Sequence, residues 1–168
     1  MTSILVPIGG TPNDRLALQE IIKRHMVAPA SDVHLINVQT PFNARIARFS
    51  SRQDRRDHHH QRAEAALAPA REMLARFSIP HAVHVESGDR AALIALAARK
   101  LGCDRIVMAT ARKNALTRLL QSSVTAKVME LSPVPVEVIP GTEMSRWERL
   151  GIPAAVGAGL ALIAAIGD

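Results

Sequence analysis

The chain of 168 residues is poor in cysteine and in aromatic rings: it has one cysteine, no tyrosine, three phenylalanines and one tryptophan. A single cysteine excludes a small scaffold held together by disulfides, which needs several paired cysteines. Few rings are available to stack on bases, and such stacking is the usual basis of single-stranded nucleic-acid binding. The sequence also lacks zinc-finger spacing and a basic zipper, so no nucleic-acid partner is expected.

The N-terminus has no secretory signal pattern. Residues 1–3 hold no basic side chain, and the apolar run at residues 4–8 is too short for the core of a signal peptide. With Cys103 as its one cysteine, the domain is expected in the cytoplasm.

The composition is that of a folded protein with a basic surface. Hydrophobic residues make up 48% of the chain, which is too many for a disordered protein. The length allows one domain of ordinary size with a short appendage. The formal charge is +6, and six arginines lie between residues 45 and 62. This basic run is either a solvated connection or a surface that meets phosphates or an anionic membrane.

Short apolar runs alternate with segments of helical periodicity. The runs predict five strands at residues 4–8, 32–38, 81–85, 105–109 and 133–139. The other segments predict helices within residues 11–25, 66–77, 90–101 and 116–131. This alternation is typical of an α/β protein with a mainly parallel, doubly wound sheet. Ligands of such sheets bind where the strands end, which here means after Ile8, Val38 and Ala109.

Several residues indicate where helices begin, end or bend. Asp89 is a suitable N-cap for the third helix, and Gly102 is its C-terminal stop. Pro69 interrupts an apolar stripe, so a kinked or restarted helix is expected there. Residues 41–60 are polar and basic, which predicts a long connection with room for some helix.

Four segments together resemble the universal stress protein family, over roughly residues 3–140. They lie at residues 4–10 (ILVPIGG), 88–89 with 103–108 (GD, CDRIVM), 116–128 (LTRLLQSSVTAKV) and 133–136 (PVPV). The resemblance implies a Rossmann-like fold, similar to the adenine nucleotide alpha hydrolases, with a five-stranded parallel sheet of order 3-2-1-4-5. It also implies a non-enzymatic regulatory or stress-response role that involves a partner protein.

Many members of that family bind ATP through a glycine pattern, which this chain has lost. The positions of the pattern fall on Ala109, Arg112, Ser122 and Ser123, so all three of its glycines are replaced. Members also tend to carry an acid after the first strand, where this chain has Gly9. The resemblance therefore implies weakened or lost ATP binding, and the alternative is an ATP or nucleotide sensor that uses the degenerate loop at 109–123. The candidate nucleotide contacts are Pro7, Ile8, Gly9, Val38, Ala109, Thr110, Arg112, Ser122, Ser123 and Val124.

Catalytic and metal chemistry find little support in the sequence. Ser122 and Ser123 stand before a helix N-terminus, which attracts anions, but they lack the context of a nucleophile elbow. A plain strand–loop–helix connection is the competing interpretation of that segment. Three successive histidines at residues 58–60 cannot all face one ion from a helix, so no metal is expected. The expectation is a protein that is not an enzyme, with slow ATP hydrolysis as the alternative.

The last strand is a candidate dimer interface. Pro133 and Pro135 place it at an edge of the sheet, because proline cannot donate to a strand ladder. In the family this strand commonly pairs across a homodimer, and here Val134, Val136 and Val138 are in position to do so.

The C-terminal segment differs from the rest of the chain. After the domain at residues 1–140, residues 141–149 are a polar linker, and residues 150–167 carry no charge. A helix of that length spans about 27 Å, close to the roughly 30 Å hydrocarbon core of a bilayer. Trp147 suits the membrane interface, and Arg146 and Arg149 favour a domain on the cytoplasmic side. The favoured interpretation is an anchor to the inner face of the cytoplasmic membrane; the competing one is a helix packed on the domain or across a dimer.

The anchor hypothesis can be tested by fractionation. Membranes from cells that express the full-length chain should retain it after an alkaline carbonate wash, because the uncharged segment is long enough to span the bilayer. A chain that ends at residue 144 should be released. A full-length chain that stays in solution without detergent would contradict the hypothesis.

Overall fold

The structure, a computed structural model, describes residues 2–29, 31–41, 52–110 and 124–140. Within these residues one parallel sheet has the strand order β3-β2-β1-β4-β5, which confirms the predicted order. The strands are β1 (Thr2–Pro7), β2 (Ser31–Gln39), β3 (His81–Ser87), β4 (Arg105–Thr110) and β5 (Val136–Pro140). The described chain is therefore the doubly wound α/β fold that the alternating pattern predicts.

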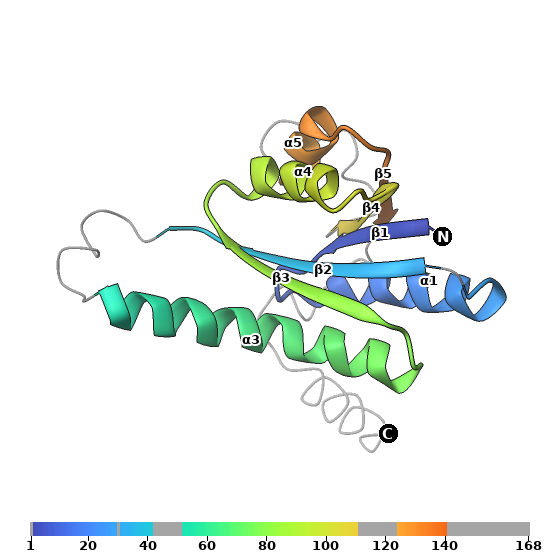
Figure 1. Cartoon of the computed structure of the whole chain (residues 1–168), viewed down its shortest axis with the longest axis horizontal. Helices are drawn as coiled ribbons and strands as arrows, with labels where there is room; N and C mark the ends of the chain where they lie inside the picture. The colour runs from blue at the N-terminus through green and yellow to red at the C-terminus, as the bar shows by residue number, and fades with distance from the viewer. Residues whose placement is uncertain (1, 30, 42–51, 111–123, 141–168) are drawn as a thin grey trace, which may run out of the picture.

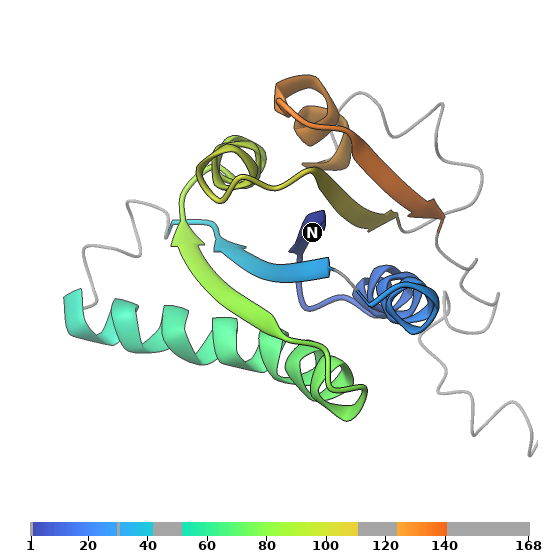
Figure 2. The same cartoon turned by 45° about the vertical axis from the view of Figure 1, so that its right-hand side comes forward.

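Helices cover both faces of the sheet. They are α1 (Asp14–Val27), α3 (Arg52–Arg76), α4 (Arg90–Lys100) and α5 (Val124–Leu131). The first two lie on one face, and α4 and α5 lie on the other (Figure 1). Figure 2 shows the same layers from a second direction, with β5 and α5 side by side at one end of the sheet. No helix within the described residues is long and apolar enough to cross a membrane, and the predicted anchor at 150–167 lies outside them.

Each face of the sheet has its own apolar core, and β1 contributes to both. Ile4 and Val6 pack with residues of α1 and α3, whereas Leu5 packs with residues of α4 and α5. Leu5 and Val6 have no exposed surface. Strands that are covered on both faces contain nearly unbroken apolar runs, which is why the sequence located them.

The predicted ends of α4 are confirmed by its hydrogen bonds. The Asp89 side chain accepts a hydrogen bond of 2.9 Å from the backbone N–H of Ala92, as an N-cap does. Gly102 has a φ of +63°, and the N–H of Cys103 donates to the carbonyl of Ala98 at 2.9 Å. This is the Schellman arrangement, in which a left-handed glycine closes the last turn.

The helix α3 begins at Arg52, well before the predicted helix at residues 66–77, so part of the connection at residues 41–60 is helical, as expected. The helix continues through Pro69, so the restart that was one of the two expectations there does not occur. Proline removes the hydrogen bond to the carbonyl four residues back, which belongs to Ala65. Ala65 is exposed, so water can satisfy its carbonyl. Leu67 and Leu74, both fully buried, fix the helix to the sheet on either side of the proline.

The last strand lies at the edge of the sheet, as predicted, but it begins at Val136 rather than at residue 133. The hydroxyl of Ser132 donates to the carbonyl of Val134 at 2.7 Å and accepts from its N–H at 3.2 Å. This local turn keeps Val134 out of the ladder, and Pro135 has no N–H to contribute. Of the predicted last helix, residues before Val124 lie outside the described residues.

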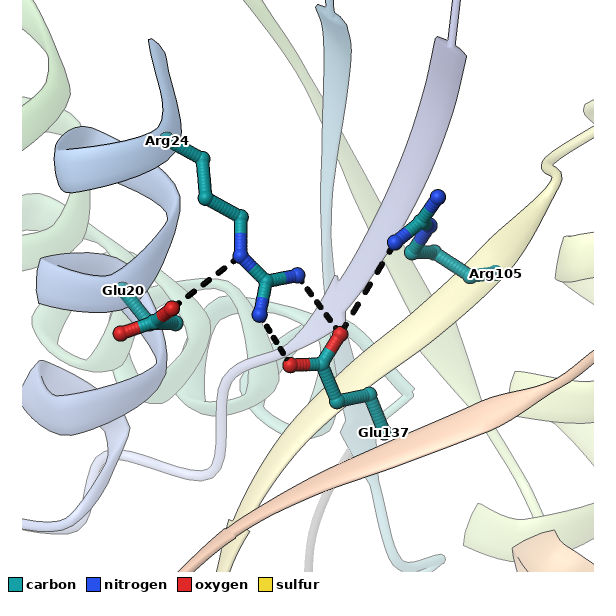
Figure 3. A network of polar contacts seen from close by, with 4 residues as sticks. All are labelled: Glu20, Arg24, Arg105 and Glu137. Carbon is teal, nitrogen blue, oxygen red and sulfur yellow. Dashed lines mark hydrogen bonds and ion pairs between the residues drawn. The ribbon is translucent and has the colours of Figure 1, made fainter. Parts of the chain in front are cut away.

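A network of charged side chains fastens β5 to α1 (Figure 3). Arg24, in the last turn of α1, donates through both terminal nitrogens to the carboxylate of Glu137. The distance from its Nη1 to Oε2 of Glu137 is 2.7 Å. Its Nε donates to Glu20 at 3.1 Å, and Arg105 approaches Glu137 at 4.0 Å. The hydrogen bonds from Arg24 lower the pKa of Glu137, and the hydrogen bonds to Glu137 raise the pKa of Arg24.

Glu137→Gln should lower the free energy of unfolding at neutral pH by about 1 kcal/mol or less. The pair is bidentate, but its side chains are 39% and 31% exposed, and solvent screens such pairs. Because folding lowers the pKa of Glu137, the stabilisation is complete above the ordinary value of 4.5 and is lost as the pH falls through the folded-state value.

Urea unfolding at neutral and acidic pH measures the difference in the free energy of unfolding between the parent chain and Glu137→Gln. The control is Glu130→Gln on α5, which removes an exposed carboxylate that makes no ion pair with any described residue. If the two chains differ in free energy of unfolding by the same amount at acidic pH, the charge of Glu137 is not the cause of the stabilisation.

Candidate functional site

The candidate site lies at the edge of the sheet where β1, β2 and β4 end. The three strands are parallel, with Pro7 beside Ile36 and Leu5 beside Ile106, so their carboxyl ends share one edge. The N–H of Ile8 donates to the carbonyl of Ile36 at 2.8 Å and extends the pairing beyond β1. Six predicted contacts are at this edge: Pro7, Ile8, Gly9, Val38, Ala109 and Thr110.

These six residues differ in what they expose. Ile8 and Val38 are 2% and 7% exposed and belong to the two cores, so their side chains are committed to packing. Ala109 also packs against a core, whereas Gly9 is exposed. Val124 begins α5 and packs against the core under α4. The other predicted contacts, Arg112, Ser122 and Ser123, lie outside the described residues.

The turn between β1 and α1 is closed by Asp14, which sequence reasoning did not single out. Its carboxylate accepts from the backbone N–H groups of Gly9 and Thr11, both at 2.9 Å, and from the Thr11 hydroxyl at 2.8 Å. A carboxylate in the first turn is favoured by the partial positive charge of the helix N-terminus. Exposed N–H groups in such a turn are potential anion donors, and here two of them already bind a carboxylate of the same chain.

Two buried amides support the same edge. The Asn37 side chain donates to the carbonyl of Ile8 at 2.7 Å, and the Gln39 side chain donates to Asn37 at 2.5 Å. The N–H of Gly88 then donates to the carbonyl of Gln39 at 3.0 Å. These bonds tie the end of β1 to β2 and to the turn before α4. Their signal in the sequence was weak: two polar residues at the end of a strand that also holds Asp32 and His34.

Two hollows open between this edge and α3. The smaller has a volume of about 270 Å³ and lies over Gly9, Asn37 and Gln39. The larger, of about 520 Å³, runs between α1 and α3. Gly10 borders both, with a φ of +77°, and a Cβ at this position would lie 3.1 Å from the Cβ of Ala66. Glycine is therefore needed where the turn crosses α3.

The environments of Cys103, His34 and His84, which lie outside the candidate site, indicate structural roles. Cys103 is buried, and burial raises the pKa of its thiol. His34 Nδ1 and His84 Nε2 lie 3.1 Å apart on neighbouring strands, and burial, followed by the charge of His34, lowers the pKa of His84. Among the described residues no group of three or more His, Cys, Asp or Glu could hold a metal ion.

An open parallel sheet with helices on both faces and a free carboxyl edge defines the Rossmann-like class of α/β proteins. Within that class the chain belongs to the universal stress protein family, whose family model matches residues 1–140. This confirms the resemblance carried by the four sequence segments. By sequence, no curated protein matches the chain.

Solved structures of universal stress proteins share the fold. One from Burkholderia pseudomallei is 21% identical, with a TM-score of 0.65 over 83% of this chain and 96% of its own. One in complex with cAMP is 13% identical, with a TM-score of 0.63 over 84% of this chain and 98% of its own. One from Arabidopsis thaliana with AMP bound is 14% identical, with a TM-score of 0.62 over 84% of this chain and 93% of its own.

Proposed function

We propose that this chain is a regulatory universal stress protein domain without catalytic activity of its own. It forms a homodimer and acts by binding a separate partner protein. Its ATP binding is weakened or lost. Residues 150–167 tether it to the inner face of the cytoplasmic membrane. The tether rests on the sequence of the tail alone, and the regulatory role rests on membership of the family. The weakened ATP binding and the dimer are argued below from described residues.

The observation that carries the proposal is the closed turn after β1. Family members tend to carry an acid where this chain has Gly9, and the Gly9 side of the turn is occupied by the Asp14 carboxylate. The N–H groups of Gly9 and Thr11 already have an acceptor and are not available to a ligand. Gly9 also has no side chain that could accept a hydrogen bond from a nucleotide, as the acid of the family does. The lost glycines at Ala109 and Arg112 act in the same direction, because side chains there hinder close approach of backbone to phosphate.

A nucleotide sensor is the second candidate function. It is favoured by two solved relatives, one in complex with cAMP and one with AMP bound. In this chain such a sensor would use the edge formed by β1, β2 and β4 together with the segment between Ala109 and Val124.

Titration calorimetry with ATP separates the two candidates. The full-length chain should show no binding in the micromolar range. A variant with the family pattern restored should bind ATP about tenfold more tightly or better, a gain of about 1.4 kcal/mol, because it regains the acid and the backbone room for phosphate. That variant combines Gly9→Asp, Ala109→Gly, Arg112→Gly and Ser122→Gly.

The control restores the three glycines and keeps Gly9, which isolates the contribution of the acid. Micromolar ATP binding by the unaltered chain would overturn the proposal and favour the sensor.

The edge strand β5 offers a short surface for pairing with a second copy. The N–H of Ile106 donates to the carbonyl of Pro135, so the alternation of the strand directs the backbone groups of Val136 and Val138 outward. Pro140 has no N–H and ends this stretch. The side chain of Val136 packs against the core under α4, so a charge at that position would report on folding rather than on pairing.

Val138→Pro should convert a dimer into a monomer, because it removes an outward N–H without breaking a bond of the sheet. Val138→Ala is the control: it loses packing but keeps the N–H. Sedimentation velocity reads out both variants. An unchanged dimer for Val138→Pro would exclude β5 as the interface.

A further inference from the structure

The smaller hollow at the carboxyl edge is positively charged. Arg62 from α3 and Arg90 from the first turn of α4 both line it, and none of its lining residues is an acid. The remaining lining is the glycine turn, the end of β2 and small side chains of α3. The two arginines are therefore the dominant charges of the hollow.

Neither arginine has an ion-pair partner among the described residues. In contrast, Arg71 on α3 pairs with Glu64, and Arg24 on α1 pairs with Glu137. The acid next to Arg90, Asp89, is engaged with the backbone of its own helix. The hollow thus presents two exposed guanidinium groups from separate elements whose donors are unused by the described protein.

The walls favour a compact ligand. The volume of about 270 Å³ is below the range of roughly 300–1,000 Å³ that is usual for drug-sized ligands. Gly9 and Gly10 carry no side chain on one wall, and the buried Asn37–Gln39 pair provides a rigid polar base. Planar guanidinium groups bind phosphate oxygens in bidentate fashion, more specifically than a surface lysine does.

We propose that the hollow between Arg62 and Arg90 binds a compact phosphorylated group, a phosphomonoester or a pyrophosphate. The site is formed by α3, the first residue of α4, the end of β2 and the glycine turn after β1, and none of the residues that line it belongs to the degenerate loop between Ala109 and Val124. The Asp14 carboxylate borders the larger hollow and is bonded within its own turn. Arg62 is the last arginine of the basic run, which gives part of that run a specific place in the fold.

Titration of inorganic pyrophosphate and of glycerol 3-phosphate, a phosphomonoester without a base, into the full-length chain tests the site. Arg62→Gln or Arg90→Gln should weaken the binding of these probes about tenfold, and the double variant about a hundredfold, since charged hydrogen bonds are removed. The control is the double variant Arg71→Gln, Arg99→Gln, which removes the same charge from the same two helices outside the hollow. It should change binding less than about threefold, as exposed charges do.

Vesicles distinguish a lipid headgroup from a free ligand. Phosphatidylcholine vesicles with phosphatidic acid present a phosphomonoester, and those with phosphatidylglycerol present a phosphodiester. Preference for phosphatidic acid that the Arg62→Gln, Arg90→Gln variant loses identifies a lipid; binding of the soluble probes without that preference identifies a free ligand. All variants keep the same tail, so differences between them report on the hollow.

Two results would overturn the site. One is that none of the phosphorylated probes binds the unaltered chain. The other is that the control pair loses as much affinity as the Arg62 and Arg90 pair, which would indicate general attraction to a basic surface. Thermal unfolding of each variant confirms that the fold is intact. The proposed protein-contact role does not depend on either result.

Discussion

The central strand β1 is covered on both faces and paired on both edges, and the described chain is organised around it. Its side chains alternate between two cores: Val6 faces α1 and α3, and Leu5 faces α4 and α5. A buried N–H or C=O without a partner costs about 1–3 kcal/mol, so β2 and β4 must both lie beside it. The same arrangement makes β1, β2 and β4 end at one edge and leaves the turn after β1 free to shape a site.

This constraint also explains how much of the fold could be predicted. Strands that are covered on both faces are apolar along their length, and their alternation with helices determines a parallel sheet. Asp89 and Gly102 were predictable because caps depend on local hydrogen bonds. The start of α3 was not, since Arg52 begins a polar stretch and the helix depends on packing further along, at Leu67 and Leu74.

The candidate site was predictable in place but not in composition. The rule that ligands bind where parallel strands end points to the edge where β1, β2 and β4 end, and the structure brings six of the predicted contacts together there. It did not show that Ile8 and Val38 direct their side chains into the cores. Nor could it show the carboxylate of Asp14 turning back to the N–H of Gly9, or two arginines far apart in the sequence lining one hollow. Such contacts depend on the tertiary arrangement, which no spacing within one segment records.

The distribution of charge along the edge separates two kinds of binding chemistry. The family pattern holds phosphate by glycine backbone at a helix N-terminus, which depends on conformational freedom that Arg112 does not have. A pair of guanidinium groups holds phosphate by charge and planar geometry and needs no glycine loop. On the β1 side the Asp14 carboxylate adds negative charge, while on the β2 side Arg62 and Arg90 are positive and unpaired within the described chain. A chain in which the glycines of the first kind of site are replaced could therefore hold a phosphate ligand by the second, and that ligand would lie toward α3 and α4 rather than at the β4–α5 segment.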